Sequence, residues 1–499
     1  MNLDAFTNHK EFNYNINVEF DTVIEQTERI IEVSNAFGLG INEAKKFSVY
    51  KDFNIGFNRD DVVYITGDSG GGKTILLQEI INRLEPSNEK ILFLDDVTPC
   101  NDEVVIESIG DTMDESIYYL SMMGLNDAYI FLRKYGELSD GQKYRYRLAK
   151  AIGLKPDFLF IDEFCCNLDR TTAKVISYNL QRVARKNNMG VFVATTHTDI
   201  LEDLNPSVLV TKSFMNNVRI QYLSYTPKKI SFYNDVEFKT GCISDYKRLS
   251  KYHYKNTGTN FPYCNIVSAW YKNDIVGVAV FSPPFLQTKG RTIKFDKKYS
   301  MMTKDVVRDI NKLFIRGSRY VISPKYRACG LGQRLVNESM TFIKNKKYLE
   351  VVTVMGKYNP VFEKCGMEKI EITEETDSAA INLDKWLKET GCDVVRINNG
   401  KYLKQFVDGL SPENKNVLKL LTGKVLHHPK IGLSSKDGKR AEVVKQEKRY
   451  KETIFNDVYN EILTYIPKLY SGMSIYYICE LPENDDSKEV NLENWEVKK

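Results

Sequence analysis

The 499-residue chain lacks the features of a membrane-inserted or disulfide-stabilised protein. No stretch approaches the ~18 uninterrupted apolar residues that a membrane-spanning helix needs, and the first residues, MNLDAFTNHKEF, hold no apolar signal core. The nine cysteines include no C-x-x-C pair, and an odd number suits reduced thiols better than a disulfide framework or a zinc site. These absences predict a cytoplasmic protein that does not enter a membrane.

The chain also lacks a strong excess of charge of either sign. Lys and Arg total 70 against 66 Asp and Glu, which leaves a formal net charge of +4, and 42% of the residues are hydrophobic. This composition excludes global disorder and a strongly basic coat for nucleic acid. Because one domain typically takes about 150 residues, we expect two or three domains, and no internal repeat is visible.

A glycine-rich segment lies between an expected strand and an expected helix. The run VVYIT at 62–66 is β-branched and aromatic, and the apolar-periodic run ILLQEIINRL follows GDSGGGKT at 67–74. The segment satisfies G-x-x-x-x-G-K-[ST], in which backbone N–H groups surround phosphates, the lysine neutralises their charge and the threonine ligates Mg²⁺. The residues predicted to bind nucleotide here are Gly67, Ser69, Gly70, Gly71, Gly72, Lys73 and Thr74.

Three further segments fit the same chemistry. Asp162 and Glu163 end the apolar run FLFI, where one carboxylate can hold Mg²⁺ and the next can polarise an attacking water. LSDGQ at 138–142 opens a helical segment, so its serine and backbone N–H groups lie at an anion-binding helix start. His197 follows the strand VFVATT, from which an imidazole can reach a γ-phosphate.

The order of these segments resembles the ABC ATPase family over about residues 30–225, with LSDGQ as the signature and 167–169 as a D-loop-like sequence. The resemblance implies two ATP molecules sandwiched in a head-to-tail homodimer, since the signature of one subunit completes the phosphate site of the other. It implies Glu163 as general base and His197 as γ-phosphate sensor. The signature residues assigned to ATP are Ser139, Gly141 and Gln142, and the Mg²⁺ ligands are Thr74 and Asp162.

Two features depart from that family. The segment after ILFLDD has no glutamine where the family's Q-loop places one, and Asp95, Asp96 and Asn101 are the candidates to replace it. Phe37 is a candidate for the aromatic residue that stacks on adenine, with core packing as the alternative.

A second glycine-containing loop follows the expected strand RYVISP at 319–324. Residues 327–332 read R-x-x-G-x-G before an amphipathic helix, so consecutive N–H groups can point at a pyrophosphate. With the hairpin IVGVAVFSPP upstream and the strand LEVVTVM downstream, this order resembles the GNAT family of N-acetyltransferases over about residues 240–370. The residues that this resemblance assigns to acetyl-CoA are Val321, Ile322, Arg327, Gly330 and Gly332.

The GNAT resemblance implies that an amine attacks a thioester carbonyl while a base removes its proton. Phe362 stands where many members carry a tyrosine acid, and phenylalanine cannot donate a proton. Tyr358 is therefore the predicted catalytic residue, and Ser282 is a further candidate. The alternative is a GNAT fold that retains binding alone.

Nucleic acid remains open as a partner. Both halves together resemble prokaryotic and phage ABC ATPases fused to a predicted acetyltransferase domain, and the hairpin end at 282–284 is similar to the phage Mom proteins, which modify adenine in DNA. Aromatic and basic residues interleave at 246–255, which can stack bases or form a solvated face. Residues 425–451 carry an excess of five positive charges, and His427 and His428 lie just before the first of these charges. The excess fits a phosphate track, a CoA-facing surface or a salt-bridged helix pair.

The predicted fold is α/β, with an ABC-type ATPase domain at 1–225, a GNAT-like domain at 226–375 and a mainly helical extension at 376–499 that can complete the second domain. The predicted function is an ATP- and Mg²⁺-dependent ATPase coupled to an acetyl-CoA-dependent acyltransferase that modifies an amino group of nucleic acid. The alternatives are an ATP-gated DNA or RNA clamp with a non-catalytic GNAT-like domain, and an ATP-regulated N-acetyltransferase for a protein or small molecule.

Overall fold

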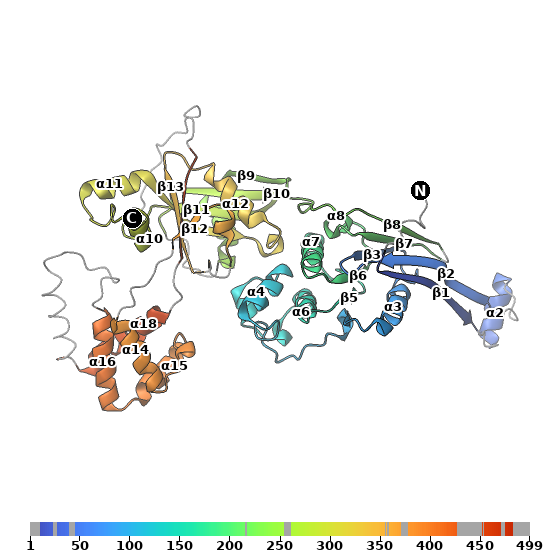
Figure 1. The fold of residues 1–499 in the computed structure, drawn as a ribbon, viewed down its shortest axis with the longest axis horizontal. Coiled ribbons are helices and arrows are strands. Elements are labelled where there is room, and N and C mark those ends of the chain that lie inside the picture. The colour runs from blue at the N-terminus through green and yellow to red at the C-terminus, as the bar shows by residue number, and fades with distance from the viewer. Residues whose placement is uncertain are drawn as a thin grey trace.

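The computed structural model describes residues 10–22, 27–38, 45–214, 217–253, 261–354, 356, 359–370, 378–426, 452, 454–470 and 475–482. Strands β3 to β8 form the first sheet, strands β9 to β15 form the second, and β1 and β2 form a separate two-stranded ribbon. Figure 1 shows helix α7 on the side of the first sheet that faces the second. None of the helices in these ranges is long and apolar enough to cross a membrane.

The first sheet confirms the α/β class predicted for this part of the chain. Its buried strands follow apolar runs of the sequence, as expected for parallel strands covered on both faces. The order is β4 (Ile91–Phe93), β5 (Phe158–Ile161), β6 (Gly190–Ala194), β3 (Val62–Gly67), β7 (Val208–Lys212) and β8 (Val218–Tyr222), all parallel except β8.

Helices cover both faces of this sheet. On one face, α3 (Lys73–Leu84) buries Leu76, Leu77 and Ile80 in the same cluster as Phe160 and Phe192. The other face carries helices that begin at capped positions: α4 (Met113–Met122), α6 (Asp140–Gly153) and α7 (Arg170–Lys186). Shorter elements here are η1 (Glu85–Ser87), η2 (Leu94–Asp96), α5 (Ala128–Phe131), η3 (Tyr135–Glu137) and α8 (Leu201–Leu204).

A two-stranded antiparallel ribbon extends from the first sheet to the far end of the molecule in Figure 1, where α2 (Glu28–Phe37) lies. It consists of β1 (Phe12–Thr22) and β2 (Lys45–Phe57). Its base is anchored by Phe57, whose ring lies 4.8 Å from that of Phe192. The ribbon thus places its side chains beside the glycine-rich loop at the end of β3.

The second sheet has seven strands in the order β14-β15-β13-β12-β11-β10-β9. All neighbours are antiparallel except β12 and β13. Its strands are β9 (Val236–Thr240), β10 (Asn265–Tyr271), β11 (Asp274–Ser282), β12 (Phe314–Ile322), β13 (Tyr348–Thr353), β14 (Glu368–Ile370) and β15 (Ile475–Glu480). Its helices are α9 (Ile243–Leu249), η4 (Ser250–Tyr252), α10 (Lys289–Lys294), α11 (Lys304–Leu313), η5 (Pro324–Tyr326), α12 (Leu331–Met340) and α13 (Val361–Lys364).

A group of helices lies between β14 and β15 in sequence and has its own apolar core, which includes Leu387, Leu403 and Ile462. These helices are α14 (Ser378–Glu389), η7 (Val394–Arg396), α15 (Gly400–Gly409), α16 (Pro412–Leu426) and α18 (Phe455–Tyr470). After them the chain returns as β15, between β13 and β14 of the second sheet. The expectation of a helical pattern from 376 onward did not foresee this strand, because a short apolar run does not reveal a distant pairing partner.

A buried charged network fastens β15 to this sheet. Arg291 of α10 and Glu350 of β13 are 1% and 0% exposed, and the guanidinium donates to both carboxylate oxygens of Glu350 at 2.6–3.1 Å. The Tyr476 hydroxyl donates to the same carboxylate at 2.8 Å. Since a buried charge is tolerated only when paired and hydrogen-bonded, these three residues require one another.

Candidate functional site

The glycine-rich loop joins β3 to α3 and is held by backbone contacts. Gly67 has φ +130°, and a Cβ there would lie 1.8 Å from the carbonyl oxygen of Lys212, so only glycine fits. Gly70 and Gly72 also have positive φ. The Lys73 ammonium donates to the carbonyl oxygens of Gly67 and Asp68 at 3.0 and 2.6 Å, and burial lowers its pKa. The loop therefore places a cation and turned N–H groups where an anion can bind. Ser69 is exposed on it.

Oxygen ligands lie directly beside this loop. The Thr74 hydroxyl, in the first turn of α3, donates to Asp162 Oδ2 at 2.5 Å. Asp162 follows β5, and its other oxygen accepts the backbone N–H of Glu163 at 2.9 Å. A hydroxyl and a carboxylate are the ligand types that Mg²⁺ takes, so Thr74 and Asp162 fit the predicted metal role.

Glu163 has an unusual backbone conformation. Its φ is +46°, in the left-handed region, and its side chain is exposed. Non-glycine residues rarely adopt this conformation, because it costs of order 1–3 kcal/mol of conformational energy. Residues that do adopt it cluster at functional sites. The turn presents the carboxylate to solvent beside Asp162.

His197 completes the same sheet edge. It follows β6, its backbone N–H donates to Thr195 Oγ1 at 3.3 Å, and its carbonyl accepts the hydroxyl of Tyr64 from β3. Strands β5, β6 and β3 are neighbours and parallel, so their carboxyl ends bring Asp162, Glu163, His197 and the loop to one edge. This edge is where ligands bind in open α/β sheets.

The signature segment lies at the start of helix α6. Ser139 is the N-cap of α6 in a capping box with Gln142, whose Oε1 accepts the Ser139 N–H at 3.0 Å. Ser139 and Asp140 are exposed, and Gly141 is half-buried. No hydrogen bond within the described ranges links Ser139 to the glycine-rich loop.

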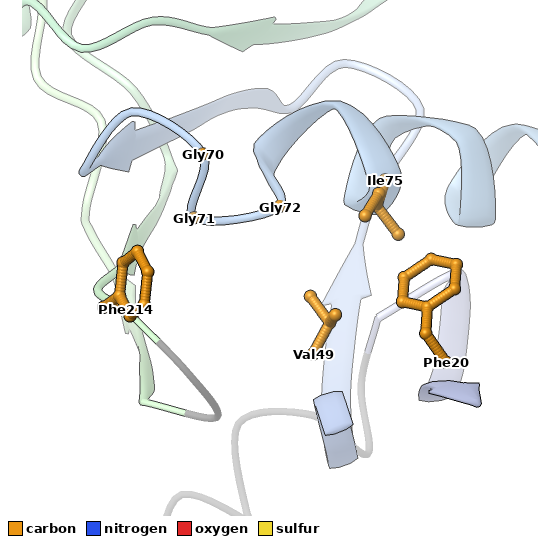
Figure 2. A pocket seen from close by; sticks show the side chains of 7 residues that line it. All are labelled: Phe20, Val49, Gly70, Gly71, Gly72, Ile75 and Phe214. Atoms are coloured by element: carbon orange, nitrogen blue, oxygen red, sulfur yellow. The ribbon is translucent and has the colours of Figure 1, made fainter. Parts of the chain in front are cut away.

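An apolar pocket of about 130 Å³ adjoins the glycine-rich loop (Figure 2). Its lining is Phe20 of β1, Val49 of β2, Gly70, Gly71, Gly72, Ile75 and Phe214. The rings of Phe20 and Phe214 are 49% and 63% exposed, so both are accessible to a ligand. A purine base beside the phosphate loop fits this lining.

Sequence reasoning missed this pocket. Phe37, which was the candidate for stacking on adenine, lies on α2, is 75% exposed and does not line it. Phe20 and Phe214 come from distant parts of the chain, and no local pattern marks either of them. Of the candidates for the missing Q-loop glutamine, Asp95 is engaged by Arg147 Nη2 at 2.8 Å.

The second glycine-containing loop is docked on the first region. Arg327 Nε donates to the carbonyl oxygen of Ile322 at 2.7 Å, and its Nη1 donates to the carbonyl oxygen and Oδ1 of Asn126 at 2.9 and 3.0 Å. Its Nη2 donates to the carbonyl oxygen of Tyr252 at 3.3 Å. The guanidinium is thus directed at the ATPase side, whereas the sequence assigned it to a pyrophosphate.

The remaining predicted acetyl-CoA residues lie around the end of β12. Strand β13 pairs with β12 only up to Gly317, and beyond this point β12 pairs, in the part described, with β11 alone. Val321 is buried, Ile322 is half-buried, Gly330 has φ +90° as N-cap of α12, and Gly332 follows in its first turn. The two strands therefore separate next to the start of a helix.

Of the two candidates for acyl transfer, the structure describes only Ser282. Tyr358 lies outside the described residues. Phe362 is 7% exposed, and its ring lies 5.4 Å from that of Tyr320 and 5.5 Å from that of Tyr477. Ser282 is 1% exposed and donates to Ser318 Oγ at 2.8 Å.

The structure describes most of one predicted basic segment and little of the other. In the 246–255 stretch, Tyr246 is fully buried against Phe261 and so cannot stack a base, whereas Lys247, Arg248 and Lys251 are exposed. The stretch from 427 to 451, including His427 and His428, lies outside the described residues.

Comparison with known proteins concerns the first region. Residues 50–165 match the family model described as ABC transporter. The chain contains an ABC-type ATPase domain. The matched family supports ATP hydrolysis as the reaction of this domain.

Proteins similar to this domain include a transport ATP-binding protein and a ribosome protection protein. The Ergothioneine transport ATP-binding protein EgtV of Helicobacter pylori is 25% identical over 181 residues, which is 30% of this chain and 84% of EgtV. The Ribosome protection protein VmlR of Bacillus subtilis is 29% identical over 153 residues, 30% of this chain and 26% of VmlR. The ATP-binding cassette MJ0796, in a dimeric post-hydrolysis state bound to ADP and Pi, aligns with 43% of this chain and 99% of its own at 16% identity and a TM-score of 0.31.

Proposed function

We propose that two copies of this chain bind two ATP molecules in a head-to-tail sandwich and hydrolyse them. The observation that carries this proposal is the exposed start of α6, which no described hydrogen bond joins to the glycine-rich loop of its own chain. The glycine-rich loop, Asp162, Glu163 and His197 share one edge, while Ser139 caps an exposed helix start. A second copy can supply Ser139, Gly141 and the dipole of α6 to the γ-phosphate.

Each residue then has a definite task. Lys73 and the loop N–H groups hold the β- and γ-phosphates, and Thr74 with Asp162 would hold Mg²⁺, which neutralises developing phosphate charge. Glu163 accepts a proton from the attacking water, and His197 contacts the γ-phosphate. Phe20 and Phe214 cover the base.

Sedimentation of the Glu163→Gln variant with Mg–ATP tests the sandwich. We expect the mass of two chains with ATP and of one chain without it. Adding Ser139→Arg should restore the single-chain mass, whereas Glu413→Arg, at an exposed helix start outside the ATPase domain, should leave the dimer intact. A single-chain mass for Glu163→Gln at saturating ATP contradicts the proposal.

We further propose that the second domain binds acetyl-CoA between β12 and β13. The support is the strand order, in which four antiparallel strands precede a parallel pair, and the separation of that pair beside the N-terminus of α12. Because Arg327 is engaged elsewhere, the backbone N–H groups of α12 supply the phosphate contacts. Titration of acetyl-CoA into the full chain should show binding that Gly332→Arg abolishes and Gly366→Ala retains; no binding to the unmodified chain contradicts it.

The acceptor we propose is an amino group of nucleic acid, held by the exposed cations of α9. Labelled acetyl-CoA offered with DNA, tRNA or protein extract should mark a nucleic acid in the presence of ATP. Label on protein alone would identify a protein acetyltransferase. ATP hydrolysis stimulated by DNA without any label would identify a clamp.

A further inference from the structure

The loop from Lys325 to Leu331, which we call the docked loop, contacts a part of the ATPase domain that is linked to its signature. Arg145, four residues after Gly141, donates through Nε to the carbonyl oxygen of Gly141 and through Nη1 to that of Gly124, both at 3.0 Å. Two residues beyond Gly124, Asn126 accepts Arg327. Arg145 and Asn126 thus connect the start of α6 to the docked loop.

A second connection runs from the D-loop-like segment. Asp169 caps α7 by accepting the Thr172 N–H and hydroxyl at 3.2 and 2.6 Å, and its Oδ1 lies 3.8 Å from the ammonium of Lys325. Burial opposes the ionisation of Asp169, but the hydrogen bonds from Thr172 and the charges of Lys325 and Arg145 outweigh it and hold its pKa below the usual range. The carboxylate therefore stays charged towards the docked loop.

Apolar packing already joins the two domains without these polar contacts. Val175 and Tyr178 of α7 belong to one buried cluster with Tyr326, Cys329 and Leu331. The polar pairs lie beside this cluster, nearer the N-termini of α6 and α7. Their removal should leave the domains docked, so a role beyond adhesion is open to them.

We propose that the Asn126–Arg327 and Asp169–Lys325 pairs form a relay that couples the nucleotide state of the ATPase domain to the docked loop of the second domain. The inference rests on the proposed sandwich, which places the start of α6 against the partner's nucleotide, while the start of α7 closely follows Asp162 and Glu163 of the chain's own nucleotide site. When these helix starts shift on ATP binding, Asn126 and Asp169 shift with them, and both residues then displace their partners Arg327 and Lys325 in the docked loop. Such coupling between two sites usually requires an interface that can adopt two distinct packed arrangements.

The relay is reciprocal. If ATP changes the affinity of the docked loop for a ligand, that ligand changes the affinity for ATP by the same factor, typically about 5- to 150-fold. The docked loop ends with Gly330 and the first residue of α12, where we place acetyl-CoA. ATP binding thus regulates the site at which the second substrate binds.

Hydrogen–deuterium exchange of the full chain carrying Glu163→Gln tests the relay. With Mg–ATP we expect slower exchange at 139–145 and an altered exchange rate at 325–334. Arg327→Lys keeps the charge but cannot reach Ile322, Asn126 and Tyr252 together, so it should abolish the change at 325–334 and keep that at 139–145. Arg308→Lys, on the exposed face of α11, is the matched control and should alter neither.

The outcomes separate this inference from the proposed function. A change at 139–145 without one at 325–334 overturns the relay and leaves ATP binding standing. A change at both segments that survives Arg327→Lys also overturns it. No change at either segment overturns both proposals.

A double-mutant cycle on ATP affinity gives an independent reading. Arg327→Ala removes both hydrogen bonds to Asn126, whereas Asn126→Ala removes the Oδ1 bond and keeps the bond to the backbone carbonyl. Each variant should shift the Kd for ATP, Asn126→Ala less than Arg327→Ala, and the double variant should shift it no further than Arg327→Ala alone. Thermal unfolding confirms that each variant is folded, and Asn126→Asp with Arg327→Lys serves if the alanine variants are not. Additive shifts contradict the relay.

Discussion

The two glycine-containing loops of this chain make the same backbone turn and use it differently. Each joins a strand to a helix whose N-cap is a glycine of positive φ, +95° at Gly72 and +90° at Gly330. In the first loop the cation Lys73 folds over its own loop, beside an open pocket. In the second, the cation Arg327 reaches across to Asn126. A glycine pattern specifies the turn, whereas the neighbouring elements decide what the turn faces.

The largest expected effect tests whether the first loop serves catalysis. Glu163→Gln removes the proposed base, so kcat for ATP hydrolysis should fall by about 10²- to 10⁴-fold while ATP still binds. Steady-state phosphate release and equilibrium nucleotide binding measure the two quantities. Glu202→Gln, an exposed carboxamide substitution on α8, should change neither, and unreduced turnover by Glu163→Gln would remove this residue from its role.

The second sheet depends on a buried ion pair. Glu350→Ala leaves Arg291 charged and unpaired at 1% exposure, so we expect a loss of about 3–5 kcal/mol in the free energy of unfolding. Asp305→Ala breaks an ion pair in which both side chains are at least 75% exposed and should cost under about 1 kcal/mol. Urea denaturation compares them; equal losses would show that the network does not fasten β15.

Substitutions of two exposed phenylalanines, one inside the pocket beside the first loop and one outside it, should differ in their effect on the Kd for ATP. Phe20→Ala removes a ring that we propose to stack on the base, and stacking is worth about 1–3 kcal/mol, so the Kd for ATP should rise roughly 5- to 150-fold. Phe37→Ala, outside the pocket, should leave it unchanged. The reverse ranking, measured by nucleotide titration, would place adenine near α2.

The smallest effect sharpens the comparison of the loops. Gly70→Ala and Gly330→Ala both add a Cβ at positive φ with nothing closer than 3.7 Å, so each should cost about 1 kcal/mol of stability. Only Gly70→Ala should also raise KM for ATP, because Gly70 lines the nucleotide pocket. KM measurements alongside thermal unfolding decide this, and equal increases of KM in the two variants would contradict the separate role of Gly70 in nucleotide binding.

Local patterns predicted the elements that depend on neighbours in sequence. Strands β3, β5 and β6, the turn at 67–74 and the carboxylates after β5 each follow from a short run of residues. Long-range pairings could not be predicted in this way. Strand β15 pairs with β13 more than 100 residues away, the pocket combines Phe20 with Phe214, and Arg327 meets Asn126 only because two domains dock.

The dependence of specific activity on protein concentration tests the central claim most directly. If each ATP is held between two copies of the chain, hydrolysis per chain should fall as the protein is diluted below the dimer dissociation constant at fixed saturating Mg–ATP, and it should recover on reconcentration. A specific activity that stays constant over a thousandfold dilution, in a protein that sediments as single chains, would contradict the account.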